Sequence, residues 1–168
     1  EKINAPYIKH RKTGLPFFTL KVASSLDGMV ATKTGESQWI TGPAARAYGH
    51  HMRDNSDAIL VGINTVEKDD SKLTTRLEVS SGRDPIRIIL DSSLNIKPSA
   101  NVLNLKSTAP TWIATTVKPS HRKVPLLTKK GAEILFCQKD RKGHVDLKQL
   151  LKYLGGRGVV NLLVEGGP

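Results

Sequence analysis

Short apolar runs alternate with segments of helical periodicity along most of the chain. Each run is bounded by glycine, proline or polar residues, as is typical of buried strands. Strands are therefore expected at residues 17–23, 57–62, 85–91, 111–115, 132–137 and 159–164. Helices are expected at residues 43–55, 64–68 and 146–154. This alternation predicts an α/β fold, a three-layer sandwich whose central, mostly parallel sheet is covered on both faces.

Local signals refine this prediction at the helix starts. Asn64 or Thr65 is the expected cap of the short second helix, and Asp146 is the expected cap of the third. Residues 1–15 are rich in charge and are expected to form an extended lead-in. The apolar face of helix 43–55 that we expect to be buried comprises Ala45, Tyr48 and Met52. A second face of the same helix carries Arg46, His50 and Arg53.

Glycine or small polar residues recur where the expected strands end. They are Gly62, the pair Asp91-Ser92 and the pair Glu165-Gly166. In open α/β sheets the ligand crevice lies outside the carboxyl ends of the strands. These strand ends therefore predict one ligand-binding rim. The motif G-x-G-x-x-G is absent, which argues against an ordinary dinucleotide-binding fold.

Composition narrows the classes of partner. The formal net charge is +11, but the basic residues are scattered and aromatic residues are few, so small anionic ligands are favoured over nucleic acid. No apolar segment is long enough to cross a bilayer, and the N-terminus lacks the pattern of a secretion signal. The single cysteine, Cys137, excludes an internal disulfide and favours a cytoplasmic setting. The histidines form no metal-binding motif, and Asp69-Asp70 is interpreted as a solvated turn, so no metal is expected.

Several residues have both a chemical and a structural interpretation. Lys21 lies among apolar neighbours, so it should either extend outward or meet an anion. Asp27 belongs to a polar loop that is more simply a capped turn, and Trp39 could pack on a planar ligand or anchor its loop in the core. Arg53 and Arg76 are candidate forks for phosphate or carboxylate, although such residues are more often at the surface.

Five motifs in a fixed order carry a resemblance to a known family. They are LKVASSLDGMVA, GESQWITG, HMRDNSDAILVGINTVEKDDSKLTTR, PIRIILDSSL and LLVEGGP. Together they resemble the reductase domain of the bifunctional riboflavin-biosynthesis deaminase/reductase, over residues 16–168. The resemblance implies a dihydrofolate-reductase-like fold and NADPH-dependent reduction of 5-amino-6-(5-phosphoribosylamino)uracil, whose ribosyl ring opens to a ribityl chain. It also implies a homodimer, a linker at residues 1–15 that follows a deaminase domain, and further elements beyond Pro168, without which the domain is truncated.

The resemblance also assigns roles to individual residues. The residues that would contact NADPH are Ala23, Trp39, Thr65, Asp69, Ser92, Gly166 and Gly167. Those that would contact the substrate are Ser37, Arg53, Leu73, Arg76 and Glu165. The proton that the sugar oxygen gains would come from Lys21, Asp27 or Glu165, which the sequence does not rank. The family often has arginines where this chain has Ser93 and Asn95, so the preference for NADPH over NADH stays open, with Lys97 as a possible substitute.

Two other interpretations remain at this point. A dihydrofolate or pteridine reductase on the same fold would be distinguished by its turnover of dihydrofolate. A non-catalytic nucleotide-binding module would bind NADP tightly without turnover. The oligomeric state, and the activity of these residues in isolation, are also left open by the sequence.

Overall fold

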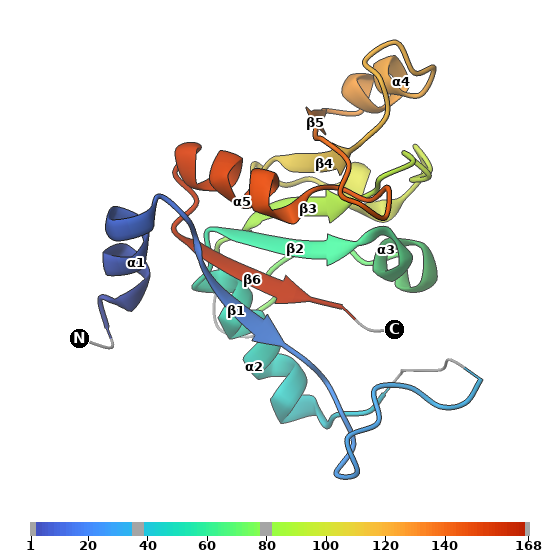
Figure 1. The fold of residues 1–168 in the computed structure, drawn as a ribbon. Helices are drawn as coiled ribbons and strands as arrows, with labels where there is room; N and C mark the ends of the chain where they lie inside the picture. The colour runs from blue at the N-terminus through green and yellow to red at the C-terminus, as the bar shows by residue number, and fades with distance from the viewer. Residues whose placement is uncertain (1–2, 35–38, 78–81, 167–168) are drawn as a thin grey trace.

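The computed structural model describes residues 3–34, 39–77 and 82–166, and these residues form one parallel sheet with helices on both faces (Figure 1). Its strand order is β1-β6-β2-β3-β4-β5, and every neighbouring pair is parallel. The strands are β1 (Phe17–Lys21), β2 (Ala58–Gly62), β3 (Ile86–Leu90), β4 (Thr111–Thr115), β5 (Ala132–Phe136) and β6 (Asn161–Glu165). The expected α/β class is confirmed, and the expected strands lie within two residues of the observed ones.

The helices divide between the two faces of the sheet. They are α1 (Ala5–Thr13), α2 (Pro43–Asp54), α3 (Ile63–Asp69), α4 (Val124–Lys129) and α5 (Leu147–Gly156), with a 3-10 turn η1 (Asn101–Leu103). One apolar cluster joins Ile59 and Val61 to residues of α3, η1 and α4. The other joins Ala58 and Leu60 to α5, which lies in front of the sheet in Figure 1. Because successive strand residues face opposite sides, the chain builds two cores and the three expected layers.

Several local expectations were wrong. The expected lead-in is not extended over its described residues 3–15, because α1 occupies most of them and ends on Gly14, whose φ of 67° suits a helix terminus. Helix α3 begins at Ile63 after Gly62 and has no side-chain cap, so neither Asn64 nor Thr65 has that role. Asp146 does cap α5, because its carboxylate accepts hydrogen bonds from the backbone N–H groups of Lys148 and Gln149.

The predicted buried face of α2 was also largely wrong. Ala45 and Tyr48 are exposed, and only Met52 of that face packs against the core. The face carrying Arg46, His50 and Arg53 turns toward the protein instead. At this end of the sheet Arg53 pairs with Glu165 at the end of β6, so part of the cationic stripe has a partner there.

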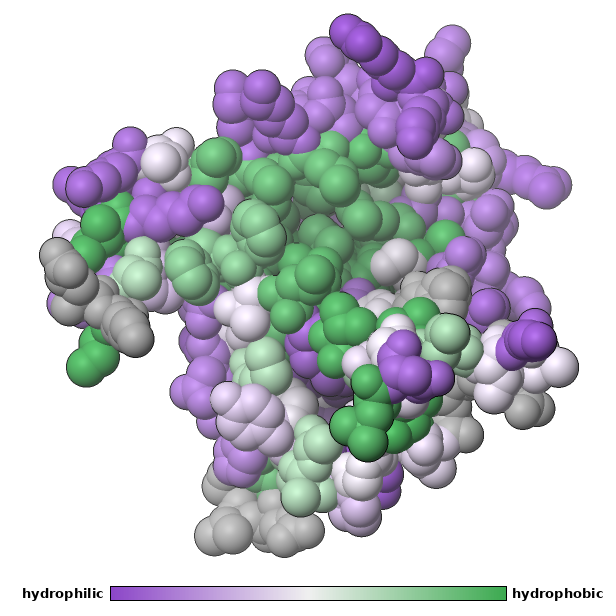
Figure 2. Space-filling view, turned by 60° about the horizontal axis from the view of Figure 1, so that its bottom comes forward, coloured by the Kyte–Doolittle hydropathy of each residue, from purple (hydrophilic) through white to green (hydrophobic). Residues whose placement is uncertain are grey.

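Strand β1 is the outermost strand at its end of the described sheet, and one of its faces is uncovered. Phe18, Leu20 and Val22 project from that face, and Leu20 is 65% exposed. Figure 2 views the molecule from this side and shows hydrophobic side chains gathered next to the arm formed by α1. Among the described residues, no helix is long and apolar enough to cross a membrane.

The C-terminal end of α5 packs directly on the end of α1. The carbonyl oxygen of Gly155 lies 3.0 Å from Nε2 of His10, and a Cβ at position 155 would overlap the backbone of Gly14. We expect Gly155→Ala to lower the free energy of unfolding by about 1–3 kcal/mol, because rigid backbone must shift.

The neighbouring Gly156 supplies the control for this substitution. A Cβ there meets nothing within 4 Å, so Gly156→Ala should be neutral or should stabilise the helix by up to about 1 kcal/mol. Urea unfolding of both variants measures the difference. Equal effects at the two positions would contradict the packing described here.

Candidate functional site

Two cavities open at the carboxyl ends of the strands and share a common border. The first, which we call the arginine cavity, has a volume of about 510 Å³ and includes Arg46, Arg53 and Arg76 in its lining. The second, the Ser92 cavity, has a volume of about 560 Å³ and lies beyond the ends of β2 and β3. The residues that line both are Thr65, Glu165 and Gly166. The strand ends therefore converge on one rim, as the sequence predicted.

A larger cavity, of about 750 Å³, lies at the opposite ends of the strands. Its arginines already have partners, since Arg83 contacts Asp57 at 3.5 Å and Arg157 contacts Glu133 at 2.7 Å. It contains none of the residues that the sequence singled out for chemistry. The rim with the two smaller cavities is therefore the better candidate site.

The border between the two cavities is built on a paired arginine and glutamate. Nε and Nη2 of Arg53 donate to the two carboxylate oxygens of Glu165 at 3.0 and 2.8 Å, and Nη1 donates to the carbonyl of Thr74 at 3.1 Å. The side chains of Arg53 and Glu165 are only 16% and 8% exposed. Such a two-pronged, largely buried pair fixes the carboxylate in position. The fork of Arg53 is thus engaged by Glu165 within the lining of the arginine cavity.

Lys21 lies beside this pair. It is the register partner of Glu165 on the neighbouring strand, so both side chains project from the same face of the sheet. It lines the arginine cavity, and its Cε lies 3.9 Å from the position of a Cβ on Gly49 of α2. The side chain of Lys21 therefore extends into the arginine cavity, where it could meet an anionic ligand.

The mouth of the arginine cavity carries an exposed aromatic ring. Trp39 is 73% exposed, and the guanidinium of Arg46 stacks over its ring at 4.5 Å from the centroid. Nη1 of Arg46 also donates to the carbonyl of Thr41 at 2.7 Å. Trp39 is therefore not a core anchor, and its indole is available to a planar ligand.

His50 of α2 contacts Arg76, which lines the arginine cavity. Nη2 of Arg76 lies 3.4 Å from Nε2 of His50. Burial lowers the pKa of His50, and the positive charges of Arg53 and Arg76 lower it further, against opposing effects of the Thr74 backbone and Glu165. Nearby Leu73 is buried with a φ of 56°, an unusual conformation for a branched side chain, and it lines the cavity.

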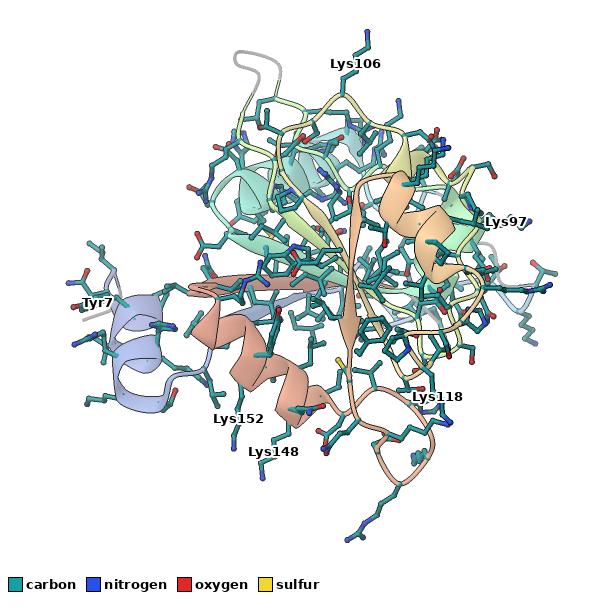
Figure 3. The ribbon with its side chains drawn as sticks, turned by 90° about the horizontal axis from the view of Figure 1, so that it is seen from above. Tyr7, Lys97, Lys106, Lys118, Lys148 and Lys152 are labelled. Atoms are coloured by element: carbon teal, nitrogen blue, oxygen red, sulfur yellow. The ribbon has the colours of Figure 1, made fainter. Side chains whose placement is uncertain are left out.

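The Ser92 cavity is bounded by a loop that hydrogen bonds hold firmly. The buried carboxylate of Asp91 accepts the N–H groups of Asn95 and Ile96, each at 2.8 Å. The hydroxyl of Ser92 accepts the N–H of Val145 at 3.1 Å. Ser93 and Asn95 also line this cavity, whereas Lys97 does not and extends away from the body of the protein in Figure 3.

The structure separates the site residues expected from the sequence by the cavity that they line. Those that line the arginine cavity, in addition to the shared border, are Lys21, Ala23, Trp39, Arg53, Asp69, Leu73 and Arg76. Ser92 lines the other cavity. Asp27 lines neither, because it lies in an exposed loop where its carboxylate accepts the hydroxyl of Ser25 at 2.5 Å. Ser37 and Gly167 lie outside the described residues.

Other lining residues were not singled out as site residues from the sequence. Arg46 could have been found from its place on the stripe of α2 that also carries Arg53. Lys72 has no such signal. The five cations of the arginine cavity exceed its three carboxylates, which suits an anionic ligand. One of those carboxylates, Asp70, is bound to the N–H and side chain of Asn101. In the described residues no three metal-binding side chains cluster.

Comparison with known proteins is informative over nearly the whole chain. The family model "RibD C-terminal domain" matches residues 16–168. The chain is 40% identical to the riboflavin biosynthesis protein RibD of Bacillus amyloliquefaciens over 167 residues, and 41% identical to that of Aquifex aeolicus over the same length. Each match covers 99% of this chain and 44% of the relative. The chain thus spans less than half the length of these relatives.

Solved structures show the same similarity. RibD of Acinetobacter baumannii superposes with a TM-score of 0.80 at 34% identity, over 98% of this chain and 43% of that one. A deaminase/5-amino-6-(5-phosphoribosylamino)uracil reductase of Thermotoga maritima gives 0.78 at 32% identity, over 96% and 42% of the two chains. The yeast riboflavin biosynthesis reductase Rib7, at 23% identity and a TM-score of 0.71 over 99% of this chain and 73% of that one, shows the fold alone. The expected dihydrofolate-reductase-like fold is confirmed.

Proposed function

Because the chain belongs to the RibD C-terminal domain family, we propose that it reduces 5-amino-6-(5-phosphoribosylamino)uracil with NADPH in riboflavin biosynthesis. In this reaction C1 of the sugar gains a hydride, the bond from C1 to the ring oxygen breaks, and that oxygen gains a proton. The product carries an open ribityl chain. The name of the Thermotoga maritima relative supports this substrate.

One observation carries the proposal, the shared border of the two cavities. Thr65, Glu165 and Gly166 line both the Ser92 cavity and the arginine cavity. An elongated cofactor that lies in the first can therefore present its reactive end to a substrate in the second. Hydride transfer depends mainly on such positioning of the two partners.

The residues of the Ser92 cavity fit a dinucleotide. Gly166 has a φ of 149°, and a Cβ there would lie 3.4 Å from Oγ1 of Thr65, so glycine keeps the border open to a close backbone approach. Thr65, Ser92 and Gly166 would hold the diphosphate and its ribose. Ala23, Trp39 and Asp69 would contact the nicotinamide end, since they line the adjoining cavity. When bound, NADPH supplies the hydride.

The arginine cavity fits the phosphorylated substrate. Arg76 would bind the phosphate, Leu73 would pack against the substrate, and Ser37 is also proposed as a contact. The carboxylate of Glu165, held by Arg53, would accept a hydrogen bond from a substrate hydroxyl. Lys21 is then the proton donor to the sugar oxygen, because it lines this cavity and its ammonium carries transferable protons.

The wider setting of the domain follows from its relatives. We infer that the chain acts as one part of a longer protein that also contains a deaminase domain. The name of the Thermotoga maritima relative, which this chain covers by 42%, supports that inference. We also propose that the protein acts in the cytoplasm as a homodimer.

The assay that tests the function uses the purified protein with NADPH and two candidate substrates. NADPH should be consumed with the phosphoribosylaminouracil and not with dihydrofolate, and mass spectrometry should find two hydrogens added to the product. Turnover of dihydrofolate alone would favour a pteridine reductase. Tight binding of NADP with no turnover of either compound would favour a non-catalytic binding module.

A further inference from the structure

We propose that His50 and Arg76 together form the subsite for the substrate's phosphate, and that His50 takes up a proton from solvent when a phosphate dianion binds. This rests on the proposed function, since it specifies how the same site recognises its substrate. It adds a residue, His50, that neither the sequence motifs nor the resemblance assigned to binding.

The contact between the two side chains defines the starting state. A guanidinium can only donate hydrogen bonds, so at 3.4 Å from Nη2 of Arg76 the Nε2 atom of His50 must be the acceptor. The ring proton is then on Nδ1, and the imidazole is neutral. Arg76 is exposed and its guanidinium can turn to an arriving phosphate. Nε2 then loses its donor and becomes free to bind a proton and donate to the phosphate.

The surrounding charges favour the uptake of a proton by His50 when phosphate binds. Arg53 lies one turn along α2 from His50, Arg76 approaches from the loop after α3, and Glu165 and Lys21 come from β6 and β1. Burial, Arg53 and Arg76 lower the pKa of His50 in the free protein. A phosphate dianion reverses the local charge, so it should raise that pKa. Binding is then accompanied by proton uptake and weakens as pH rises through the pKa of the bound state.

Because the fork of Arg53 is occupied, a phosphate bound at Arg76 has sites for a second donor. The fork of Arg53 already binds both oxygens of Glu165. Arg76 alone would leave most acceptor sites of a phosphate without a protein donor. His50 is the titratable group in contact with Arg76, and it shares its stripe of α2 with Arg46 and Arg53, which line the cavity.

Calorimetry with D-ribose 5-phosphate tests the inference in the purified protein. Titrations in buffers of different ionisation enthalpy, between about pH 6 and pH 8, give the number of protons taken up. The unaltered protein should take up a fraction of a proton per molecule of ribose 5-phosphate bound. His50→Gln should bind the probe about tenfold more weakly at the acidic end and should lose the proton uptake. Inorganic sulfate, which stays a dianion throughout, should show the same difference without titration of the ligand.

The neighbouring His51 gives a matched control. It is exposed on the same helix, so His51→Gln should leave both the affinity and the proton uptake unchanged. If His50→Gln fails to fold, NMR titration of the His50 ring in the unaltered protein replaces it, and its pKa should rise when ribose 5-phosphate is added. No rise would overturn the inference.

Two other results would also overturn it. One is equal proton uptake by the unaltered protein and the His50→Gln variant, and the other is no binding of ribose 5-phosphate by the unaltered protein. Turnover of the aminouracil by the unaltered protein is measured separately. If turnover is present and proton uptake is absent, the phosphate subsite is wrong and the reductase function stands.

Discussion

Replacing Lys21 with methionine is expected to lower kcat for reduction of the phosphoribosylaminouracil by about 10²–10⁴-fold. Affinity for NADP, measured by fluorescence quenching, should stay nearly unchanged. Methionine keeps much of the length and volume of the lysine stem but has no proton to give. The side chain lines the same cavity as Glu165 and is its register partner on the neighbouring strand, so loss of the proton donor should affect the chemical step directly.

Lys72→Met is the matched control for this prediction. Lys72 also lines the arginine cavity, but it is exposed and lies on the loop after α3. Its loss should weaken substrate binding through the reduced positive charge and should leave kcat largely intact. If both variants change KM alike and neither changes kcat, Lys21 is not the proton donor.

The Arg53–Glu165 pair should contribute strongly to stability once one partner is removed. Arg53→Met leaves a carboxylate that is 8% exposed without its guanidinium, and we expect the free energy of unfolding to fall by about 3–5 kcal/mol. The double variant Arg53→Met, Glu165→Leu removes both charges. It should regain most of that loss, because the cost comes from an unpaired buried charge and not from the missing pair itself.

A double-mutant cycle by urea unfolding measures this coupling, with Glu165→Leu as the second single variant. The double variant should remain inactive, since the carboxylate at the border of the two cavities is gone. The double variant therefore separates the effect of the pair on stability from its effect on activity. Additive losses of stability in the double variant would show that the two side chains are not energetically coupled.

The sheet was predictable because its strands are buried and continuous in hydrophobicity, and parallel strands bring their ends to one rim. The pairing of Arg53 with Glu165 across the rim was not predictable from the sequence. The two residues are 112 positions apart, and nothing in the sequence around either one indicates the other. The orientation of α2 was missed for a related reason. Periodicity locates an apolar face, but the polar residues that the helix meets at the strand ends come from β1 and β6.

Other differences have physical causes as well. The α1 segment is strongly polar with no buried residues, so its sequence carries no helical stripe, and its contacts with Gly155 of α5 are distant in the chain. Asp27 occupies the capped turn that was its structural alternative, because the hydroxyl of Ser25 lies within reach two residues away. Trp39 could be located only by the fold, since a lone tryptophan in a polar loop suits either a core or a ligand.

The uncovered side of β1 affects how this polypeptide behaves in concentrated solution. Phe18, Leu20 and Val22 stand beside the outermost backbone of the described sheet, and such an edge is a template for pairing with another chain. A preparation limited to these 168 residues should therefore self-associate as its concentration rises. Crystallisation and calorimetry would then benefit from a lysine in place of Leu20, whose side chain projects from the face of β1 opposite to Lys21.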